Sequence, residues 1–201
     1  GSPALAMKVL EKNVQEYLFF DLEESALENI ESFATHQTIM PPIKTFNCDS
    51  IDGVLKLLPS LPRTTFLHID PYEIGKRNNN ANTYLDVLIN ATRLGMKCLL
   101  WYGFMTINDK TRLNKYVSEK LKKANIKDYT CSELIMNAIR KDTIVCNPGI
   151  LGSGILATNL SQYSNAMIQD YSKKLVDIYK YAQYKEFDGS LYNGTNQMLL
   201  I

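Results

Sequence analysis

The chain has 201 residues, of which 45% are hydrophobic and 21% charged, a mixture typical of a globular protein with a sizeable core. Its net charge of +1 excludes a global field that attracts nucleic acid or a membrane surface, so any polyanion site must be a local patch. No apolar run has membrane-spanning length, and the start at Gly1 lacks the basic leader and apolar stretch of a signal peptide. We therefore expect a cytoplasmic protein without a membrane partner.

The cysteines and histidines do not form a recognisable metal or disulfide pattern. The four cysteines are far apart in the sequence, with no Cys-x-x-Cys pair: Cys48, Cys98, Cys131 and Cys146. We expect reduced thiols in or beside strands and no metal site. The two isolated histidines, His36 and His68, are expected to be structural or solvated rather than ligands.

Apolar periodicity predicts helices that alternate with short strands along the chain. Helices are expected at residues 3–12, 25–34, 52–58, 84–94, 110–124 and 162–185. Strands are expected at residues 17–21, 43–49, 65–70, 97–104, 129–136, 152–159 and 197–201. This alternation predicts a single α/β domain over residues 1–201, with a mainly parallel sheet covered by helices on both faces.

The first three predicted strands all end on an aspartate, at Asp21, Asp49 and Asp70. Because the carboxyl ends of parallel strands meet at one edge of a sheet, we expect these carboxylates to line one cleft there. Nucleoside cofactors use such acids to bind a ribose hydroxyl and an adenine amine.

The segment after the third strand carries the most specific chemistry. Asp70 supplies an acceptor, Pro71 a rigid backbone carbonyl and Tyr72 a flat ring, in that order. Enzymes that methylate the exocyclic amine of an extruded base need two acceptors for the amine and a ring that stacks on the base. The alternative is a plain turn, because Asp-Pro is common turn chemistry.

Six short motifs in a fixed order carry a resemblance that covers essentially the whole chain. They are Gly1-Ser2-Pro3, Asp21, Asp49-Ser50 with Leu58-Pro59, Asp70-Pro71-Tyr72-Glu73, Trp101-Tyr102-Gly103, and Gly152-Ser153-Gly154 with Asn159. In this order and spacing the chain resembles the bacterial 23S rRNA adenine-N6 methyltransferases of the RlmJ type.

The resemblance implies a three-layer sandwich of the class I methyltransferase kind, Rossmann-like, that transfers a methyl group from S-adenosylmethionine to adenine N6 in nucleic acid, with rRNA favoured and DNA the alternative. Asp70, Pro71 and Tyr72 would be the catalytic residues. The implied cofactor-binding residues are Ser2, Asp21, Asp49, Ser50 and Asp70.

Two departures from the family pattern bear on activity. The catalytic turn lacks one proline, so Tyr72 follows Pro71 directly and its ring is either displaced or turned into the core. The family's earlier segment, with a glycine-rich donor-binding turn and a first strand, has no counterpart here. The sheet would then have a gap beside the strand at residues 17–21, or that strand would pair directly with residues 65–70. A scaffold or nucleic-acid-binding protein with an inactive methyltransferase fold is the alternative function.

Other features fit two interpretations each. A lysine-rich segment either contacts phosphates or forms a solvated helix face: Lys110, Arg112, Lys115, Lys120, Lys122, Lys123 and Lys127. The pair Trp101-Tyr102 either lines a base pocket or belongs to the core. The asparagines at residues 78–80 form either a mobile loop or a substrate-gating loop.

Overall fold

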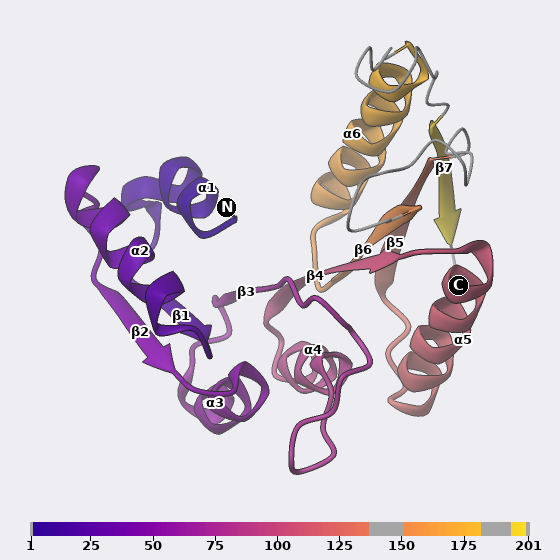
Figure 1. The fold of residues 1–201 in the computed structure, drawn as a ribbon. Coiled ribbons are helices and arrows are strands. Elements are labelled where there is room, and N and C mark those ends of the chain that lie inside the picture. Colours follow the sequence, from indigo (N-terminus) through magenta and orange to yellow (C-terminus); the bar gives the residue numbers. More distant parts are fainter. Residues whose placement is uncertain (1, 137–150, 182–193, 200–201) are drawn as a thin grey trace. The chain divides into compact units, whose positions relative to one another are not determined.

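The computed structural model describes residues 2–136, 151–181 and 194–199 (Figure 1). The chain forms two compact units: Gly1–Ser60 with Asn78–Asn82, and Leu61–Arg77 with Thr83–Ile201. We call them unit 1 and unit 2. The single domain predicted over residues 1–201 stays a prediction.

Unit 1 is a small α/β structure. Its elements are α1 (Ser2–Leu10), β1 (Tyr17–Asp21), α2 (Glu24–His36), β2 (Ile43–Asn47), α3 (Ser50–Leu57) and the 3-10 turns η1 (Glu11–Asn13) and η2 (Leu58–Ser60). Strands β1 and β2 pair in parallel, with Asp21 opposite Asn47.

The two faces of β1 are covered by different helices because successive side chains of a strand point to opposite sides. Tyr17 and Phe19 pack with Met7 of α1 and Ala34 of α2. Phe20 lies on the other face, against Gly53 of α3, where an added Cβ would come within 2.8 Å of its ring. Only glycine therefore lets α3 approach the strand this closely.

Unit 2 contains the larger sheet. Its elements are β3 (Phe66–Ile69), α4 (Tyr84–Arg93), β4 (Lys97–Phe104), α5 (Ile107–Lys123), β5 (Tyr129–Met136), β6 (Gly152–Thr158), α6 (Gln162–Tyr181) and β7 (Gly194–Leu199). Within the described residues each helix and strand expected from the sequence is present, with ends that differ by no more than three residues. Cys146 and the predicted helix and strand ends at residues 182–185 and 200–201 lie outside the described residues.

The larger sheet, in unit 2, is mixed, so the prediction of a mainly parallel sheet was wrong. The order in unit 2 is β3-β4-β6-β5-β7, in which β3 and β4 are parallel and the other three pairings are antiparallel. Strand β6 lies between β4 and β5 and runs opposite to both. The helix–strand alternation that predicted parallel strands holds only as far as β5; β6 then pairs back antiparallel on β5.

Helices cover both faces of the sheet in unit 2 (Figure 1). Thr92 of α4 contacts Cys98 and Thr158 on one face, and Lys110 of α5 contacts Glu133 on the same face. Ser132 points to the opposite face, where it donates a hydrogen bond to Ser172 of α6. This three-layer arrangement is the α/β fold expected from the sequence.

A buried carboxylate, Glu133, lies between the sheet and α5. Its side chain is 0% exposed. It forms a 2.8 Å ion pair with Lys110 and accepts a 2.7 Å hydrogen bond from the Tyr102 hydroxyl. Asn114, with its amide oriented to satisfy both groups, donates to Glu133 at 2.7 Å and accepts from Lys110 at 3.0 Å. Each oxygen of the buried charge therefore has a partner, as burial requires.

The Tyr102 hydroxyl and the Cys131 thiol beside Glu133 are held in their neutral forms. Burial, together with the neighbouring Cys131 and Glu133, raises the pKa of Tyr102, which keeps its hydroxyl protonated as a donor. Burial likewise raises the pKa of the Cys131 thiol to about 11. The thiol is therefore protonated at neutral pH and chemically inert, as a core cysteine is expected to be.

Replacing Lys110 by Met should destabilise the protein by roughly 3–5 kcal/mol, because it leaves the Glu133 carboxylate buried without its charge partner. Urea unfolding would measure this. Lys115→Met is the matched control on the same helix, since Lys115 is 76% exposed and forms only a 3.9 Å surface pair with Glu119. Equal free energies of unfolding for the two variants would contradict the role given to this pair.

Helix α4 begins with a network around Asp86. Thr83 caps the helix in a capping box with Asp86, and Lys120 of α5 forms a 2.6 Å ion pair with the same carboxylate. Burial alone would raise the pKa of Asp86, but the hydrogen bonds from Lys120 and Thr83 outweigh it and lower the pKa from 3.8. This network joins the start of α4 to the end of α5.

Asp86→Asn should therefore lower stability in a pH-dependent way. A carboxyl group whose pKa is lower in the folded state stabilises that state fully above its unfolded pKa, and the contribution disappears as the pH falls through the folded value. We expect a loss of about 1 kcal/mol at pH 7 that shrinks as the pH falls below the unfolded pKa of about 4, measured by urea unfolding at each pH. The exposed Asp128→Asn variant should show no such trend.

Candidate functional site

Asp21 and Asp49 lie at the same edge of the unit 1 sheet. Asp21 is the last residue of β1, and Asp49 follows the parallel neighbour β2 by two residues. The Asp21 carboxylate accepts a 2.9 Å bond from the Glu23 amide, and its backbone carbonyl accepts from the Cys48 amide at 3.1 Å. These local bonds fix the turn that carries the first acid.

Asp49 has a structural task of its own, as the N-cap of α3. Its Oδ1 atom accepts from the backbone amides of Ile51 and Asp52 at 2.9 and 3.1 Å. A carboxylate has about four lone-pair sites, so Oδ2 can accept a further donor from a ligand. Ser50 is the first residue of α3, and Ser2 the first of α1; both are partly buried.

In unit 2, Asp70 follows directly on β3, and Pro71 and Tyr72 begin the loop beyond it. Asp70 is exposed, Pro71 is buried, and the Tyr72 ring is 86% exposed. The buried proline anchors the turn, while the tyrosine points away from the core. The expectation that the shortened turn could push Tyr72 into the core is wrong, and its ring is available for stacking.

Asp21 and Asp49 belong to unit 1, and Asp70 belongs to unit 2. The proposal that all three carboxylates share one cleft therefore stays a prediction. Within each unit the acids do stand where parallel strands end.

The asparagine loop after the Asp70 turn is tied down by a side chain of α3. The Asp52 carboxylate accepts hydrogen bonds from the side-chain amides of Asn78 and Asn80 at 2.6 and 3.0 Å. The side-chain oxygen of Asn78 accepts from the backbone amide of Asn82 at 2.8 Å. Both the nitrogen and the oxygen of the Asn78 side chain are thus hydrogen-bonded, so this loop has a defined conformation.

Other candidates from the sequence are structural in this fold. Tyr102 is 1% exposed and is used entirely in the core network around Glu133. Both histidines are exposed, and His36 forms its hydrogen bonds within its own helix.

The described part of the chain holds no cluster of three or more side chains suited to a metal ion, and none of its helices is both long and apolar enough to cross a membrane.

The lysine-rich segment divides into paired and unpaired charges. The cations of the first four turns of α5 have carboxylate partners: Lys110 with Glu133, Arg112 with Asp109, Lys115 with Glu119 and Lys120 with Asp86. The described ion pairs do not include Lys122, Lys123 or Lys127, which are all exposed. The cations in the first part of the segment are thus used in ion pairs, whereas the last three lysines are exposed and lie outside those pairs.

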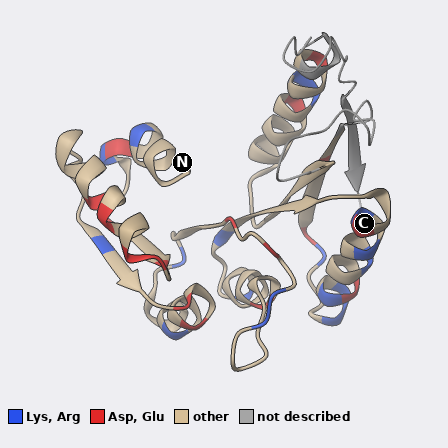
Figure 2. Cartoon of the chain, in the orientation of Figure 1, with Lys and Arg blue, Asp and Glu red and all other residues tan. Residues whose placement is uncertain are grey.

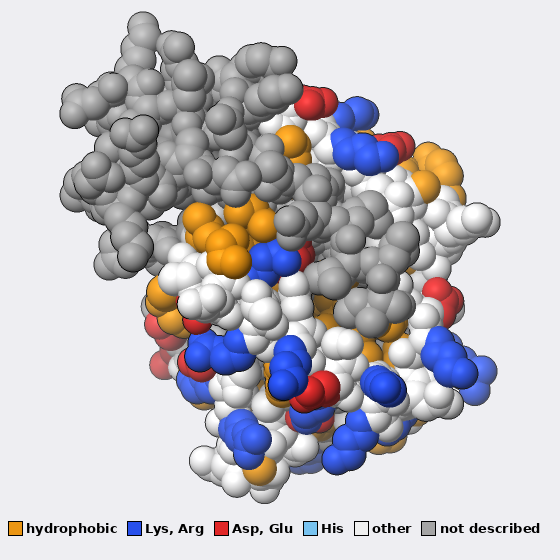
Figure 3. Space-filling model, turned by 90° about the vertical axis from the view of Figure 1, so that its right-hand side faces the viewer, with side chains coloured by type: hydrophobic (Ala, Val, Ile, Leu, Met, Phe, Trp, Pro, Cys, Tyr) orange, Lys and Arg blue, Asp and Glu red, His pale blue; other side chains and the backbone are white. Residues whose placement is uncertain are grey.

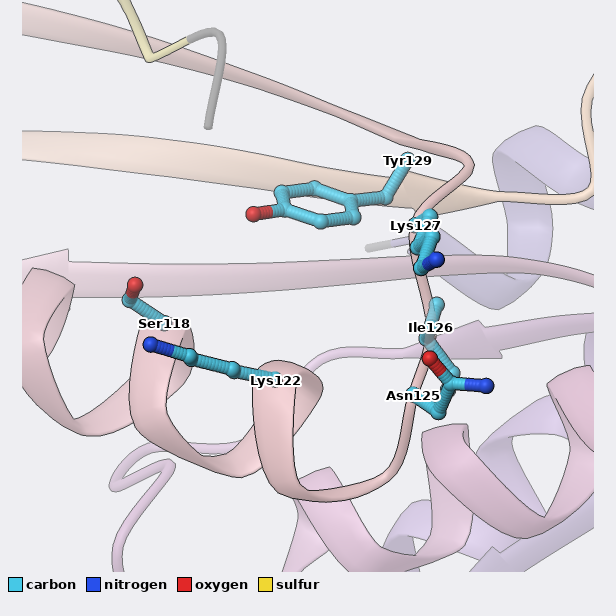
Figure 4. Close-up of a pocket in the computed structure, with 6 residues that line it drawn as sticks. All are labelled: Ser118, Lys122, Asn125, Ile126, Lys127 and Tyr129. Carbon is cyan, nitrogen blue, oxygen red and sulfur yellow. The ribbon is translucent and has the colours of Figure 1, made fainter.

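A hollow of about 230 Å³ opens beside these last lysines (Figure 4). Its lining residues are Ser118, Lys122, Asn125, Ile126, Lys127 and Tyr129. Figure 4 shows the Tyr129 ring on one side, with its hydroxyl directed toward the Ser118 end, and the extended Lys122 side chain on the other. The sequence analysis did not predict that Tyr129 lines a hollow. Its position directly after the lysine-rich segment was the signal that could have indicated this.

Comparisons with known structures define the class of fold. The chain matches a protein of Legionella pneumophila assigned to the family model DUF519, with 18% identity and a TM-score of 0.63. The match covers 99% of this chain but 65% of that one, so this chain spans about two thirds of its length. The chain therefore has an α/β fold like that of this protein.

Two further structures match less well. A precorrin-8W decarboxylase of Methanobacterium thermoautotrophicum shares 12% identity at a TM-score of 0.47, over 76% of this chain and 74% of that one. A protein of Clostridium thermocellum, provisionally described as an rRNA methylase, shares 14% identity at a TM-score of 0.44. That match covers 72% of this chain and 73% of the other. No family model matches the sequence, and a comparison with curated proteins finds no match.

The capping role of Asp49 can be separated from ligand binding. Asp49→Ala should lower the free energy of unfolding by about 1 kcal/mol, because two backbone amides of α3 lose their acceptor. Asp49→Asn keeps that acceptor and should be close to wild type in urea unfolding. A destabilisation by Asn as large as that by Ala would mean that the cap is not what Asp49 contributes to stability.

Proposed function

We propose that this protein is an S-adenosylmethionine-dependent adenine-N6 methyltransferase that acts on nucleic acid, with rRNA as the favoured substrate. The observation that carries the proposal is the turn after β3, where an exposed Tyr72 ring follows an exposed Asp70 carboxylate at the end of a parallel strand. The fold match supports it, because the DUF519 family model is that of the RlmJ family.

The turn would act on an adenine extruded from its helix or loop. Asp70 would accept one N–H of the exocyclic amine and the Pro71 carbonyl the other, which leaves the nitrogen lone pair directed at the methyl donor. Tyr72 would stack on the base, an interaction worth roughly 1–3 kcal/mol. As the N–C bond would form, the S–C bond of the donor would break, and the Asp70 carboxylate would stabilise the positive charge that develops on nitrogen. The methylated amine would then lose one proton to water.

The acids of unit 1 have the chemistry that a nucleoside donor needs. Asp21 would accept from ribose hydroxyls and Oδ2 of Asp49 from an adenine amine, with Ser50 and Ser2 beside them. When bound, S-adenosylmethionine supplies an electrophilic methyl group on its sulfonium sulfur. Its departure leaves a neutral thioether, so no metal ion or redox partner is needed to balance the transfer.

An inactive methyltransferase fold that serves as a scaffold or nucleic-acid-binding protein is the second candidate. The observation that favours it concerns the sheet edges: in the described residues β1 pairs only with β2, and β3 pairs only with β4. None of the described strands is followed by a glycine-rich turn of the kind that binds the donor in the RlmJ family. A DNA adenine methyltransferase relative has the same chemistry and differs only in substrate.

The activity is tested by substitution at Asp70. Asp70→Ala should reduce methyl transfer to rRNA about a hundredfold or more, because the missing acceptor acts mainly in the transition state, while donor affinity and thermal stability stay near wild type. Single-turnover transfer of labelled methyl groups and calorimetric titration with S-adenosylhomocysteine would measure the two effects. Full activity of Asp70→Ala would refute an amino-methyltransferase mechanism.

Two companion variants separate the candidates. Tyr72→Ala should weaken nucleic-acid binding, whereas Tyr72→Phe, which keeps the ring, should not. Asp21→Ala should weaken donor binding. A folded protein that binds neither S-adenosylmethionine nor S-adenosylhomocysteine would favour the scaffold over the enzyme.

A further inference from the structure

Strands β4 and β5 begin at the same edge of the sheet in unit 2, opposite to the edge that carries Asp70. Cys98 of β4 and Tyr129 of β5 both pair with Thr158 of β6, and β4 and β5 run in the same direction. Lys97 is the first residue of β4, and Lys127 lies two residues before β5. Two cationic side chains are therefore placed at this edge by strand register alone.

Two helices end at the same edge and add further cations. Arg93, the last residue of α4, donates a 3.1 Å hydrogen bond to the carbonyl of Ala124, the C-cap of α5. Lys122 and Lys123 form the last turn of α5. Arg63 approaches from the segment before β3, where its Cδ lies 3.6 Å from the position of a Cβ on Gly95.

We call these exposed side chains the amino-edge patch. It consists of Arg63, Arg93, Lys97, Lys122, Lys123 and Lys127. Figure 3 shows Lys and Arg side chains gathered over the lower part of one face, with few Asp or Glu side chains among them, and Figure 2 shows the basic end of α5.

The charge of this patch is not compensated by the ion pairs that the described residues form. Those pairs involve the earlier turns of α5 and Lys44 of unit 1, and Asp128 is the acid adjacent to the patch in the sequence. Helix dipoles favour cations at the ends of α4 and α5, which accounts for Arg93, Lys122 and Lys123. They do not account for Lys97, Lys127 and Arg63, which lie outside the helices.

The hollow beside Tyr129 gives the patch a polar recess. Four of its lining residues have polar side chains: Lys122, Lys127, Ser118 and Asn125. At about 230 Å³ it is smaller than a usual ligand pocket of roughly 300–1,000 Å³, so it suits a phosphate or part of a nucleotide rather than a whole small molecule.

We propose that the amino-edge patch binds the phosphate backbone of RNA. Cations from five chain segments, with a hydroxyl, an amide and an aromatic face between them, match a polyanion whose charges are regularly spaced and whose bases stack on tyrosine. The patch is distinct from the Asp70 turn, because the two lie at opposite ends of parallel strands. It does not depend on methyl transfer.

The position of the patch also bears on the size of the RNA. Strand β3 has four residues, which corresponds to roughly 13 Å of strand between its two edges. An RNA that contacts both the patch and Tyr72 must therefore extend over several nucleotides.

The test is RNA binding measured by fluorescence anisotropy, without any methyl donor, with a labelled 20-nucleotide hairpin at several salt concentrations. The patch variant is Lys122→Gln/Lys123→Gln/Lys127→Gln. Its matched control is Lys12→Gln/Lys56→Gln/Lys173→Gln, which removes the same charge from exposed lysines elsewhere. Thermal melts confirm that both variants are folded.

We expect the patch variant to bind at least tenfold more weakly and the slope of its salt dependence to decrease by about one for each phosphate that the variant no longer neutralises. The control should stay within about twofold of wild type. Equal weakening in both variants, or none in either, would overturn the proposal. Displacement of the RNA by polyglutamate at the same charge concentration would also overturn it, in favour of an acidic protein partner. Failure of methyl transfer leaves the binding result unaffected, so the two proposals fail separately.

Discussion

The buried carboxylate of Glu133 is the constraint on which unit 2 depends. It belongs to β5, its partners Tyr102 and Lys110 belong to β4 and α5, and Gly154 of β6 lies against the Tyr102 ring. Only a glycine fits there, because an added Cβ would overlap the ring. A one-residue slip of β4 or β5 would turn Tyr102 or Glu133 to the other face, and the buried charge would lose its partners. Register, helix position and the choice of glycine are thus coupled through one side chain.

Local sequence predicted most of the elements because their signals are local. Thr83 and Asp86 mark the start of α4, Gly95 with its positive φ follows its end, and the apolar run at residues 97–104 is β4. The order of strands could not be predicted in this way. Strand β6 lies between β4 and β5 because of pairings across the sheet, and a 2-residue period does not say which neighbour a strand will have.

For the candidate site, too, the sequence predicted the local features but not the contacts that depend on the fold. The aspartates at strand ends are visible in the sequence, and the exposure of Tyr72 agrees with a role at the surface. The capping of α3 by Asp49 depends on backbone geometry, which the residue types only suggest. Only half of the amino-edge patch could be seen in the sequence, as Lys122, Lys123 and Lys127 of the lysine-rich segment. The other half, Arg63, Arg93 and Lys97, could not be predicted, because chain folding and not sequence proximity brings these residues to that edge.

The free edge of β3 has a consequence for how the protein behaves at high concentration. In the described residues this strand pairs with β4 alone, so one row of its backbone amides and carbonyls has no strand partner. Phe66, 49% exposed, adds an apolar side chain at the start of the same strand. An edge of this kind is a template for pairing with another chain, and proteins usually blunt it with charge, proline or a covering segment. Here Pro71 lies just beyond the strand, which limits the length of any added ladder to a few residues.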